Sequence, residues 1–381
     1  MTKKVLFITH HKLNENKGGS NGSKGSLHCF ATLFDNLAVL SPAFEGPVSP
    51  YIPSGVKLYH PNDTRSNLRK LVDMYRGVIS PLYYAVRQHL KTHRYDIIVV
   101  DHSFSGAGLI NDLKKTGAKI ITIHHNVERD YLRDNSKERP VFYRYPFLYF
   151  SKKAERDCLK NSDINLTVTE HDASVFRLWY PDAHVYNWGN FEYLSIVDKS
   201  FEERQRRLTF VITGSLCFSQ SIVPISLFIN KYWPLVHQVY QDAKLLIAGR
   251  NPSKELQQIC STDKGILLIP NPEDIESVVQ QADYYICPIS EGSGRKLRIL
   301  DGLRQGLPIL CHDVSVSGYE SIKDNHFLFS YHDEESFIES LRKITTTPIS
   351  PDKVYQAYRK EFSLSTGIMR LETFLRKENI F

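Results

Sequence analysis

The stretch from Ala282 to Leu310 constrains the fold more than any other part of the chain. Its apolar run 284–287 has the length of a buried strand, and Pro288 ends that run. A helical pattern and then a second apolar run follow, separated by Gly306 and Pro308. A strand, a helix and a strand in such close succession predict an α/β domain with a parallel sheet.

The loop inside this stretch has the composition of an anion site. Gly292 and Gly294 allow a ligand to approach the backbone closely, because they carry no Cβ. Three cations follow, in the expected first turn of the helix: Arg295, Lys296 and Arg298. The helix dipole disfavours cations there, so their presence indicates a bound anion such as a diphosphate. Asp301, one turn further, can accept two hydrogen bonds from a ribose diol.

These residues resemble the donor-binding segment of retaining glycosyltransferases of family 4. In that family a glycine loop leads into G-x-G-x-(R/K)-L-(K/R)-x-L-E and then G-x-P-(I/V). This chain reads Gly292-Ser293-Gly294-Arg295-Lys296-Leu297-Arg298-Ile299-Leu300-Asp301, followed by Gly306-Leu307-Pro308-Ile309. Asp301 stands where the family usually has its nucleotide-binding Glu. The family's second acid lies eight residues earlier, where this chain has Ser293; the nearest carboxylate is Glu291, which the resemblance makes a candidate sugar contact.

The resemblance implies the GT-B fold, in which two doubly wound Rossmann-like domains face a central cleft. Strand and helix patterns alternate through both halves of the chain, as that fold requires. We expect an acceptor-side domain at 1–195, a linker at 196–207, a nucleotide-sugar domain at 208–360, and a C-terminal helix at 361–381 that crosses back to the first domain. The polar run 198–207 marks the boundary.

The first strand, Val5–Thr9, is followed by a glycine-rich and serine-rich loop at 11–26, with a helix expected at 27–33. Gly18 and Gly19 do not fit the G-x-G-x-x-G spacing of a dinucleotide site, which argues against NAD. The resemblance places these two glycines on the acceptor side. An ordinary flexible loop is the alternative.

The strand 119–123 ends in His124-His125-Asn126, at the strand end where parallel α/β proteins place ligands. Adjacent side chains on a strand point to opposite faces, so the two histidines do not share a metal ion. The segment resembles the family's H-N-V-E motif, which implies that His125 faces the donor sugar and that Asn126 lies on the acceptor side. A core histidine is the alternative for each position.

The second domain opens with the strand 208–216, whose Gly214 loop lacks the Arg and Lys that bind the donor diphosphate in the family. Arg250, after the next strand, is a candidate for part of that role. Pro270 ends a third strand, and the resemblance implies that the following loop cradles the nucleotide base.

Two segments combine cations with aromatic residues. The first, Arg65 to Arg94, has a basic side and an apolar side and is interrupted by Pro81. The second is Glu138 to Lys160. The first segment either packs on the core or contacts the inner leaflet of the membrane. The second either leads into a packed helix or touches the acceptor or lipid headgroups. The net charge of +6 is compatible with a membrane contact. No apolar run reaches the roughly 18 residues of a membrane span.

The resulting prediction is a cytoplasmic glycosyltransferase of the hexosyltransferase type, with a peripheral contact at the inner face of the membrane as a further hypothesis. It transfers a sugar from a nucleotide diphosphate, with UDP expected, to a glycan or lipid-linked oligosaccharide in polysaccharide or glycoconjugate biosynthesis. His125, Lys296 and Glu291 are the predicted catalytic residues.

No D-x-D triad occurs, so no metal or other cofactor is expected. No nucleic-acid partner is expected either. The six cysteines show no C-x-x-C spacing, which favours a reduced protein. Three alternatives remain: a nucleotide-sugar 2-epimerase, a catalytically silent relative that binds a glycan or a protein partner, and a nucleotide-binding regulator.

Overall fold

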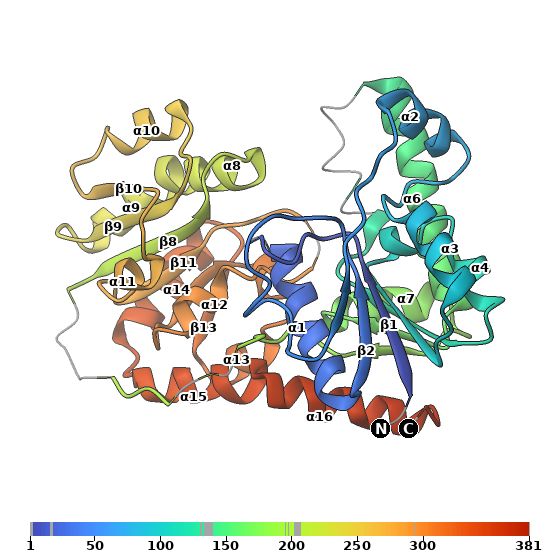
Figure 1. Ribbon diagram of the computed structural model, residues 1–381. Helices are drawn as coiled ribbons and strands as arrows, with labels where there is room; N and C mark the ends of the chain where they lie inside the picture. The colour runs from blue at the N-terminus through green and yellow to red at the C-terminus, as the bar shows by residue number, and fades with distance from the viewer. Residues whose placement is uncertain are drawn as a thin grey trace. The chain divides into compact units, whose positions relative to one another are not determined.

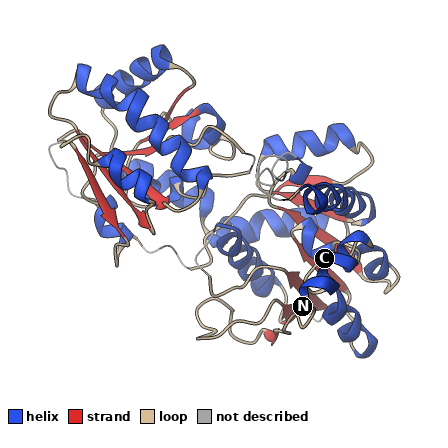
Figure 2. Ribbon diagram, turned by 90° about the horizontal axis from the view of Figure 1, so that it is seen from above, coloured by secondary structure: helices blue, strands red, loops and turns tan. Residues whose placement is uncertain are grey.

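The computed structural model describes residues 3–15, 18–129, 132, 140–194, 196, 198–201, 207–292 and 294–380. The chain divides into two compact units. Unit 1 holds residues 1–196, 292–294 and 362–381, and unit 2 holds residues 197–291 and 295–361. Each unit has its own parallel sheet with helices on both faces (Figures 1 and 2).

Among the described residues, unit 1 contains a seven-stranded parallel sheet in the order β3-β2-β1-β4-β5-β6-β7. The strands are β1 (Lys4–Thr9), β2 (Asn36–Leu40), β3 (Lys57–Tyr59), β4 (Ile97–Asp101), β5 (Lys119–His124), β6 (Ile164–Thr167) and β7 (Val185–Asn187). The order reverses between β1 and β4, and such a switch point is where doubly wound sheets bind ligands.

The helices of unit 1 cover both faces of this sheet. They are α1 (Gly18–Leu33), α2 (Asn67–Tyr75), α3 (Tyr83–Thr92), η1 (Ser103–Gly106), α4 (Ile110–Lys114), α6 (Val141–Asn161), α7 (Glu170–Trp179) and α16 (Leu364–Lys377). On β1, Val5 and Phe7 pack with residues of α1 and α16, whereas Leu6 and Ile8 pack with residues of α3 and α4. The alternation follows from the two-residue period of a strand, and it explains why the strand is apolar on both faces.

Helix α16 completes the core of unit 1, although it lies at the far end of the chain. It contacts α1 along the edge of unit 1 that holds both chain ends (Figure 1). The indole of the fully buried Trp188 donates a hydrogen bond to the carbonyl oxygen of Gly367 at 2.9 Å. A Cβ on Gly367 would stand 2.6 Å from the ring of Phe191, so the helix needs glycine at this contact.

Helix α1 corrects the predicted loop at 11–26, because it begins at Gly18 rather than at Leu27. Glycine and serine have weak helix propensity, so the sequence favoured a loop. Tertiary packing overrides that preference here, since the helix passes very close to its neighbours. A Cβ on Gly25 would lie 2.1 Å from the carbonyl oxygen of Phe191. Small residues are what allow this approach.

Among the described residues, unit 2 contains a six-stranded parallel sheet in the order β10-β9-β8-β11-β12-β13. The strands are β8 (Thr209–Ser215), β9 (Lys244–Arg250), β10 (Ile266–Pro270), β11 (Tyr284–Cys287), β12 (Ile309–His312) and β13 (Leu328–Tyr331). The helices are α8 (Ser219–Leu227), the π-turn η2 (Phe228–Tyr232), α9 (Trp233–Val239), α10 (Lys254–Cys260), α11 (Ile275–Val279), α12 (Ile299–Leu303), η3 (Asp313–Val316), α13 (Glu320–Asp324), α14 (Glu334–Thr346) and α15 (Pro351–Phe362).

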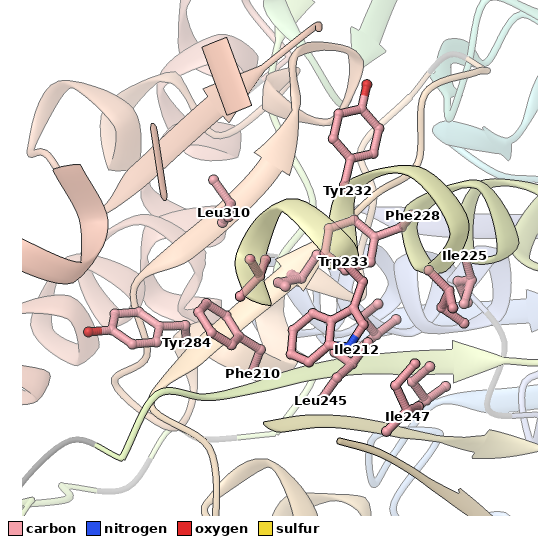
Figure 3. Close-up of a cluster of buried hydrophobic side chains, with 14 of the residues drawn as sticks. Phe210, Ile212, Ile225, Phe228, Tyr232, Trp233, Leu245, Ile247, Tyr284 and Leu310 are labelled. Atoms are coloured by element: carbon pink, nitrogen blue, oxygen red, sulfur yellow. The ribbon is translucent and has the colours of Figure 1, made fainter. Parts of the chain in front are cut away.

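The core of unit 2 is built around aromatic rings that bridge the sheet and the α8–α9 segment. Figure 3 shows Phe210 of β8 between Tyr284 of β11 and Trp233 of α9. The Phe210 centroid lies 5.1 Å from that of Tyr284 and 6.0 Å from that of Trp233. The two doubly wound sheets confirm the fold class predicted from the alternating pattern.

Prolines lie between or within several of the helices. Pro81 lies between α2 and α3, so the expected interruption is confirmed. Pro224 lies within α8, and Pro234 is near the start of α9. Within the described part of the chain, no helix is both long and apolar enough to cross a membrane.

Candidate functional site

In unit 1, the carboxyl ends of β1, β4 and β5 bring four histidines together. His10 and His11 follow β1, His102 follows β4, and His125 follows β5. Neighbouring ring centroids are 4.0 Å apart for His10 and His11, 5.6 Å for His102 and His125, and 6.0 Å for His11 and His125. The cluster lies at the switch point of the sheet.

His125 forms a hydrogen-bonded pair with Asp101, the last residue of β4. Its Nε2 lies 2.7 Å from Oδ1 of a carboxylate that is fully buried. The hydroxyl of Ser23 on α1 donates to the other carboxylate oxygen. Burial acts to raise the pKa of Asp101, but His125 and the bond from Ser23 outweigh it, and the pKa falls from 3.8 to about 2.

The carboxylate of Asp101 accepts hydrogen bonds only, so Nε2 of His125 carries the proton in this pair. Nδ1 is then the atom that His125 offers to other groups. The Nδ1 side of the ring faces Gly22 of α1, where a Cβ would lie 3.3 Å from Nδ1 and 3.1 Å from Cε1. Asp101 therefore fixes both the tautomer and the orientation of the ring.

A second histidine–carboxylate pair adjoins the first. Nε2 of His102 lies 2.7 Å from Oε1 of the buried Glu128, and the backbone N–H of Glu128 donates to Glu155 at 2.5 Å. Burial acts to lower the pKa of His102, but the charge of Glu128 and its hydrogen bond raise it above 6.5.

His10 is held in the neutral form. The hydroxyl of Ser105 donates to the carbonyl oxygen of Asp101 at 2.6 Å, so Nδ1 of His10, 3.0 Å from that hydroxyl, is the donor of their bond. Burial lowers the pKa of His10 well below 6.5, and the three neighbouring histidines lower it further.

His124 and His125 have separate surroundings, as strand alternation predicted. His124 lies 3.0 Å from Oδ1 of Asn165 and packs against Phe176, and burial lowers its pKa to about 4. It is the core histidine of the two. Among the described residues, no group of three or more His, Cys, Asp or Glu side chains is arranged to hold a metal ion.

The predicted acceptor-side glycines lie in α1 rather than in a loop. Gly18 is the first residue of the helix, and a Cβ on Gly19 would stand 2.5 Å from Cε1 of His11. Gly19 therefore lets the helix reach the histidine cluster. Asn126, the third predicted residue on this side, follows His125 and is half-buried.

In unit 2, the carboxyl ends of β8, β9 and β10 bring together Gly214, Arg250 and Pro270. Gly214 pairs with Gly249, which in turn pairs with Pro270. A Cβ on Gly249 would lie 1.8 Å from the carbonyl oxygen of Gly214, so two strand ends meet here with no room for a side chain. The side chain of Arg250 is exposed at the same edge.

Asp301 is oriented by a chain of hydrogen bonds from the sheet. Thr213 of β8 donates to Oδ2 of Asp301 at 2.8 Å and also bonds the buried hydroxyl of Tyr285 at 2.7 Å. Arg304 donates to Oδ1 of Asp301 at 2.9 Å. Burial raises the pKa of Tyr285 well above 10, as does the charge of Asp301. A carboxylate is an acceptor of hydrogen bonds only, which is the chemistry that a hydroxyl-bearing ligand such as a ribose needs.

Arg298 lies beside Gly214, at the carboxyl end of β8; we call this end of the strand the Gly214 turn. Its guanidinium donates to the hydroxyl of Ser221 at 2.8 Å and to the carbonyl oxygen of Thr213 at 3.4 Å. Gly214 has a φ of 144°, and a Cβ there would lie 2.9 Å from Nη1 of Arg298. The residues of the Gly214 turn include no Arg or Lys. The cation at this place is Arg298, which comes from the segment before α12.

The three cations lie before α12, not in its first turn as predicted. The helix begins at Ile299, because the preceding residues form tighter i→i−3 bonds, such as Leu300 N–H to Leu297 O at 3.0 Å. Arg295 lies over the ring of Tyr319, with Cζ 5.5 Å from its centroid, and the Tyr319 hydroxyl donates to Lys296 O.

The glycine loop itself is described in part. Gly292 and Gly294 have φ values of 85° and 71°, a conformation that favours glycine. Glu291 is exposed beside them. Ser293 lies outside the described residues.

Several site residues were not predicted, above all Asp101, Ser23, Thr213, Tyr285 and Arg304. Asp101 carries a recognisable signal, because it ends a buried parallel strand just as His125 follows one. The others depend on contacts between distant segments, such as Thr213 with Asp301, and leave no local pattern in the sequence.

Comparison with known proteins gives three results. Residues 207–347 match the family described as glycosyl transferases group 1. Over its whole length the chain is similar in structure to TarM, with a TM-score of 0.71, 12% identity, and coverage of 100% of this chain and 99% of TarM. It is likewise similar to the lipopolysaccharide outer core galactosyltransferase WaaB, with a TM-score of 0.69, 14% identity, and coverage of 98% and 99%.

The chain has the GT-B fold. The third result is a curated relative, an uncharacterized 44.6 kDa protein in the cps region of Klebsiella pneumoniae, which is 26% identical over 247 residues. The match spans 61% of this chain and 60% of that relative's length. The G117R mutant of S. aureus TarM has also been solved in complex with Fondaparinux, alpha-GlcNAc-glycerol and UDP. The family match covers most of unit 2.

Proposed function

We propose that this protein is a retaining glycosyltransferase that moves a sugar, as a hexosyl group, from a nucleotide diphosphate to a hydroxyl of a glycan or lipid-linked oligosaccharide. The observation that carries the proposal is the edge of unit 2 at Gly214, where Asp301 and Arg298 are both anchored. That edge lies within the region matched by the glycosyl transferase family. The complex of TarM with UDP and a GlcNAc-bearing glycerol supports UDP as donor nucleotide and a glycan as acceptor.

In this proposal Asp301 binds the ribose diol and the loop after Pro270 receives the base. The strand ends at Gly214 and Gly249 leave backbone groups uncovered by side chains, which suits a flat or charged ligand. Arg298 and Arg250 then face the diphosphate. Arg298 compensates for the missing Arg and Lys of the Gly214 turn, which counts in favour of a working donor site.

The difficult step is departure of the diphosphate, because negative charge grows on its oxygens. Lys296, Arg295 and Arg298 stabilise that charge as it develops, and no metal is needed in this scheme. Loss of one such contact raises the barrier by about 2.7–4 kcal/mol, the range measured for a lost oxyanion-hole donor.

Unit 1 contributes His125 and the acceptor side. With Nε2 bound to Asp101, the ring presents Nδ1 for the donor sugar. Glu291 contacts the hydroxyls of the sugar in this proposal, and Gly18, Gly19 and Asn126 belong to the acceptor side. The histidine cluster supports the assignment, because it occupies the switch point of the sheet.

The test is release of UDP from UDP-sugars, measured with and without a lipid-linked oligosaccharide fraction. We expect release only when acceptor is present, with an α-linked product from an α-linked donor, as seen by NMR. An epimerase would consume donor alone, whereas a silent relative or a regulator would bind it without turnover. Consumption of the donor without acceptor, or binding without turnover, would contradict the proposal.

A further inference from the structure

Two helices of unit 1 expose apolar stripes that the proposed reaction does not use. On α2, Leu68, Val72 and Tyr75 follow at i, i+4 and i+7, and their exposed fractions run from 38% to 71%. On α6 the stripe begins with Val141 and Phe142 and continues with Tyr145 and Tyr149 at the same helical spacing; all four are 62% to 68% exposed. We call these seven side chains the α2–α6 surface.

The two stripes adjoin each other. The hydroxyl of Tyr75 donates to the backbone carbonyl oxygen of Phe142 at 2.7 Å, and the two helices are in contact. Both lie at the end of unit 1 that is remote from the chain termini (Figure 1). Segments about 70 residues apart in sequence thus form one surface.

The exposure of these side chains is not explained by packing within unit 1. Helix α2 already buries its other side, where Met74 and Asp73 are almost fully enclosed. Asp73 is bound there by Arg65 and by Arg69. A helix that has already buried an inner face has no structural need for exposed Leu, Val and Tyr on its outer face.

On α2, and on α6 as far as Lys153, the charged side chains that are not buried are all cations, although Lys70 pairs with Asp63 and Lys153 with Asp157. From Val141 to Lys153, α6 carries three cations and no carboxylate: Arg144, Lys152 and Lys153. Lys152 and Lys153 follow Tyr149 by three and four residues, so they continue the same stripe. On α2, Arg69, Lys70 and the flanking Arg76 are exposed, whereas Asp73 is buried.

We propose that the α2–α6 surface docks this protein on an anionic lipid bilayer. The aromatic and aliphatic side chains enter the boundary between headgroups and acyl chains, and the lysines and arginines bind lipid phosphates. A negatively charged bilayer fits a surface on which aromatic residues alternate with cations. Within α2, and within α6 as far as Lys153, the one carboxylate is that of Asp73, which is buried. The inference does not depend on the proposed transfer reaction, since it rests on residues outside the candidate site.

The test is sedimentation of the full chain with vesicles of phosphatidylcholine alone and of phosphatidylcholine mixed with phosphatidylglycerol. Wild-type protein should bind the anionic vesicles, and less so as salt is raised. Lys152→Glu with Lys153→Glu should weaken binding at least tenfold, since each cation near such a surface is worth about one kcal/mol. Phe142→Ser with Tyr145→Ser should weaken it comparably.

The matched control is Lys114→Glu with Lys115→Glu at the C-terminal end of α4, which changes the net charge equally and lies in the same unit. Like Lys153, Lys115 is exposed and pairs with an aspartate on its own helix. The proposal is wrong if wild-type protein ignores anionic vesicles, if both test variants bind as wild type, or if the control pair loses as much. It is also wrong if light scattering shows a dimer that Phe142→Ser with Tyr145→Ser dissociates, because the surface then joins two copies. Circular dichroism verifies that each variant is folded.

Discussion

Replacing Asp101 by Asn tests whether the buried pair with His125 supports unit 1. The amide has the shape of the carboxylate and can still accept the hydrogen bond from Nε2 of His125. Its NH₂ group can donate to Ser23, whose hydroxyl already has an alternative acceptor in the carbonyl oxygen of Gly19 at 3.1 Å. The substitution therefore removes the negative charge and little else.

The magnitude follows from the pKa of Asp101, which falls from 3.8 to about 2 on folding. A carboxyl whose pKa is lower in the folded state stabilises the protein above its unfolded pKa and loses that contribution as pH falls toward its folded pKa. At 1.36 kcal/mol per pKa unit, Asp101→Asn should lower the free energy of unfolding by about 2 kcal/mol at pH 5. Roughly half of that difference should remain at pH 3.

The assay is urea unfolding at pH 5 and pH 3, followed by hydrogen exchange of peptides that cover β1, β4 and β5. Exchange in these central strands reports the stability of unit 1 separately from that of unit 2. Asp112→Asn is the control. Asp112 is a partly exposed partner of Lys115 and Arg87, both of which are themselves exposed, and its loss should change stability by less than about 0.5 kcal/mol. Equal stability of Asp101→Asn and wild type at pH 5, or a difference that does not shrink at pH 3, would refute the reasoning.

Three further predictions concern single contacts. Gly249→Ala should destabilise unit 2 by about 3 kcal/mol or more, because the new Cβ meets a backbone oxygen 1.8 Å away; an unchanged melting temperature would contradict the packing of β8 on β9. Trp188→Phe should cost about 1–3 kcal/mol in urea unfolding, since the carbonyl of Gly367 loses its donor, and an effect near zero would argue against the docking of α16. Arg298→Ala should weaken UDP binding tenfold or more, at about 1.5–3 kcal/mol for a charged hydrogen bond, whereas the exposed Arg342→Ala should bind like wild type in the same titration.

The strands of this protein are readily predicted because they are apolar on both faces. Short apolar runs such as Ile97–Asp101 and Tyr284–Cys287 fit a strand of a parallel sheet, which is covered by helices on both faces, better than any other element. Proline positions were equally informative, since Pro81 separates α2 from α3 as its chemistry requires.

The start of α1 could not be predicted from local chemistry. Residues 18–26 favour a loop by propensity and form a helix only because Gly22 and Gly25 let that helix pack against His125 and Phe191. For α1, tertiary contacts overcame the local preference. The late start of α12 at Ile299 has a different origin, in tight i→i−3 turns that no periodicity of the sequence indicates.

The candidate site was predictable only where residues follow buried strands. His125 and Gly214 were found in this way, and Asp101 carries the same signal. Partners that come from other segments escaped detection: Ser23 reaches Asp101 from α1, and Arg298 reaches Gly214 from beyond β11. Such pairs depend on the completed fold, and one sequence does not reveal them.

The central claim is that unit 2 binds a nucleotide diphosphate at Asp301 and the Gly214 turn. It is tested most directly by calorimetric titration of the intact protein with UDP and with the other nucleoside diphosphates, using Asp301→Ala and Lys296→Ala beside wild type. We predict saturable binding of one nucleotide, weakened at least tenfold in both variants, as expected for lost charged hydrogen bonds of about 1.5–3 kcal/mol. No binding of any nucleotide by wild type, or equal binding by all three proteins, would contradict the account.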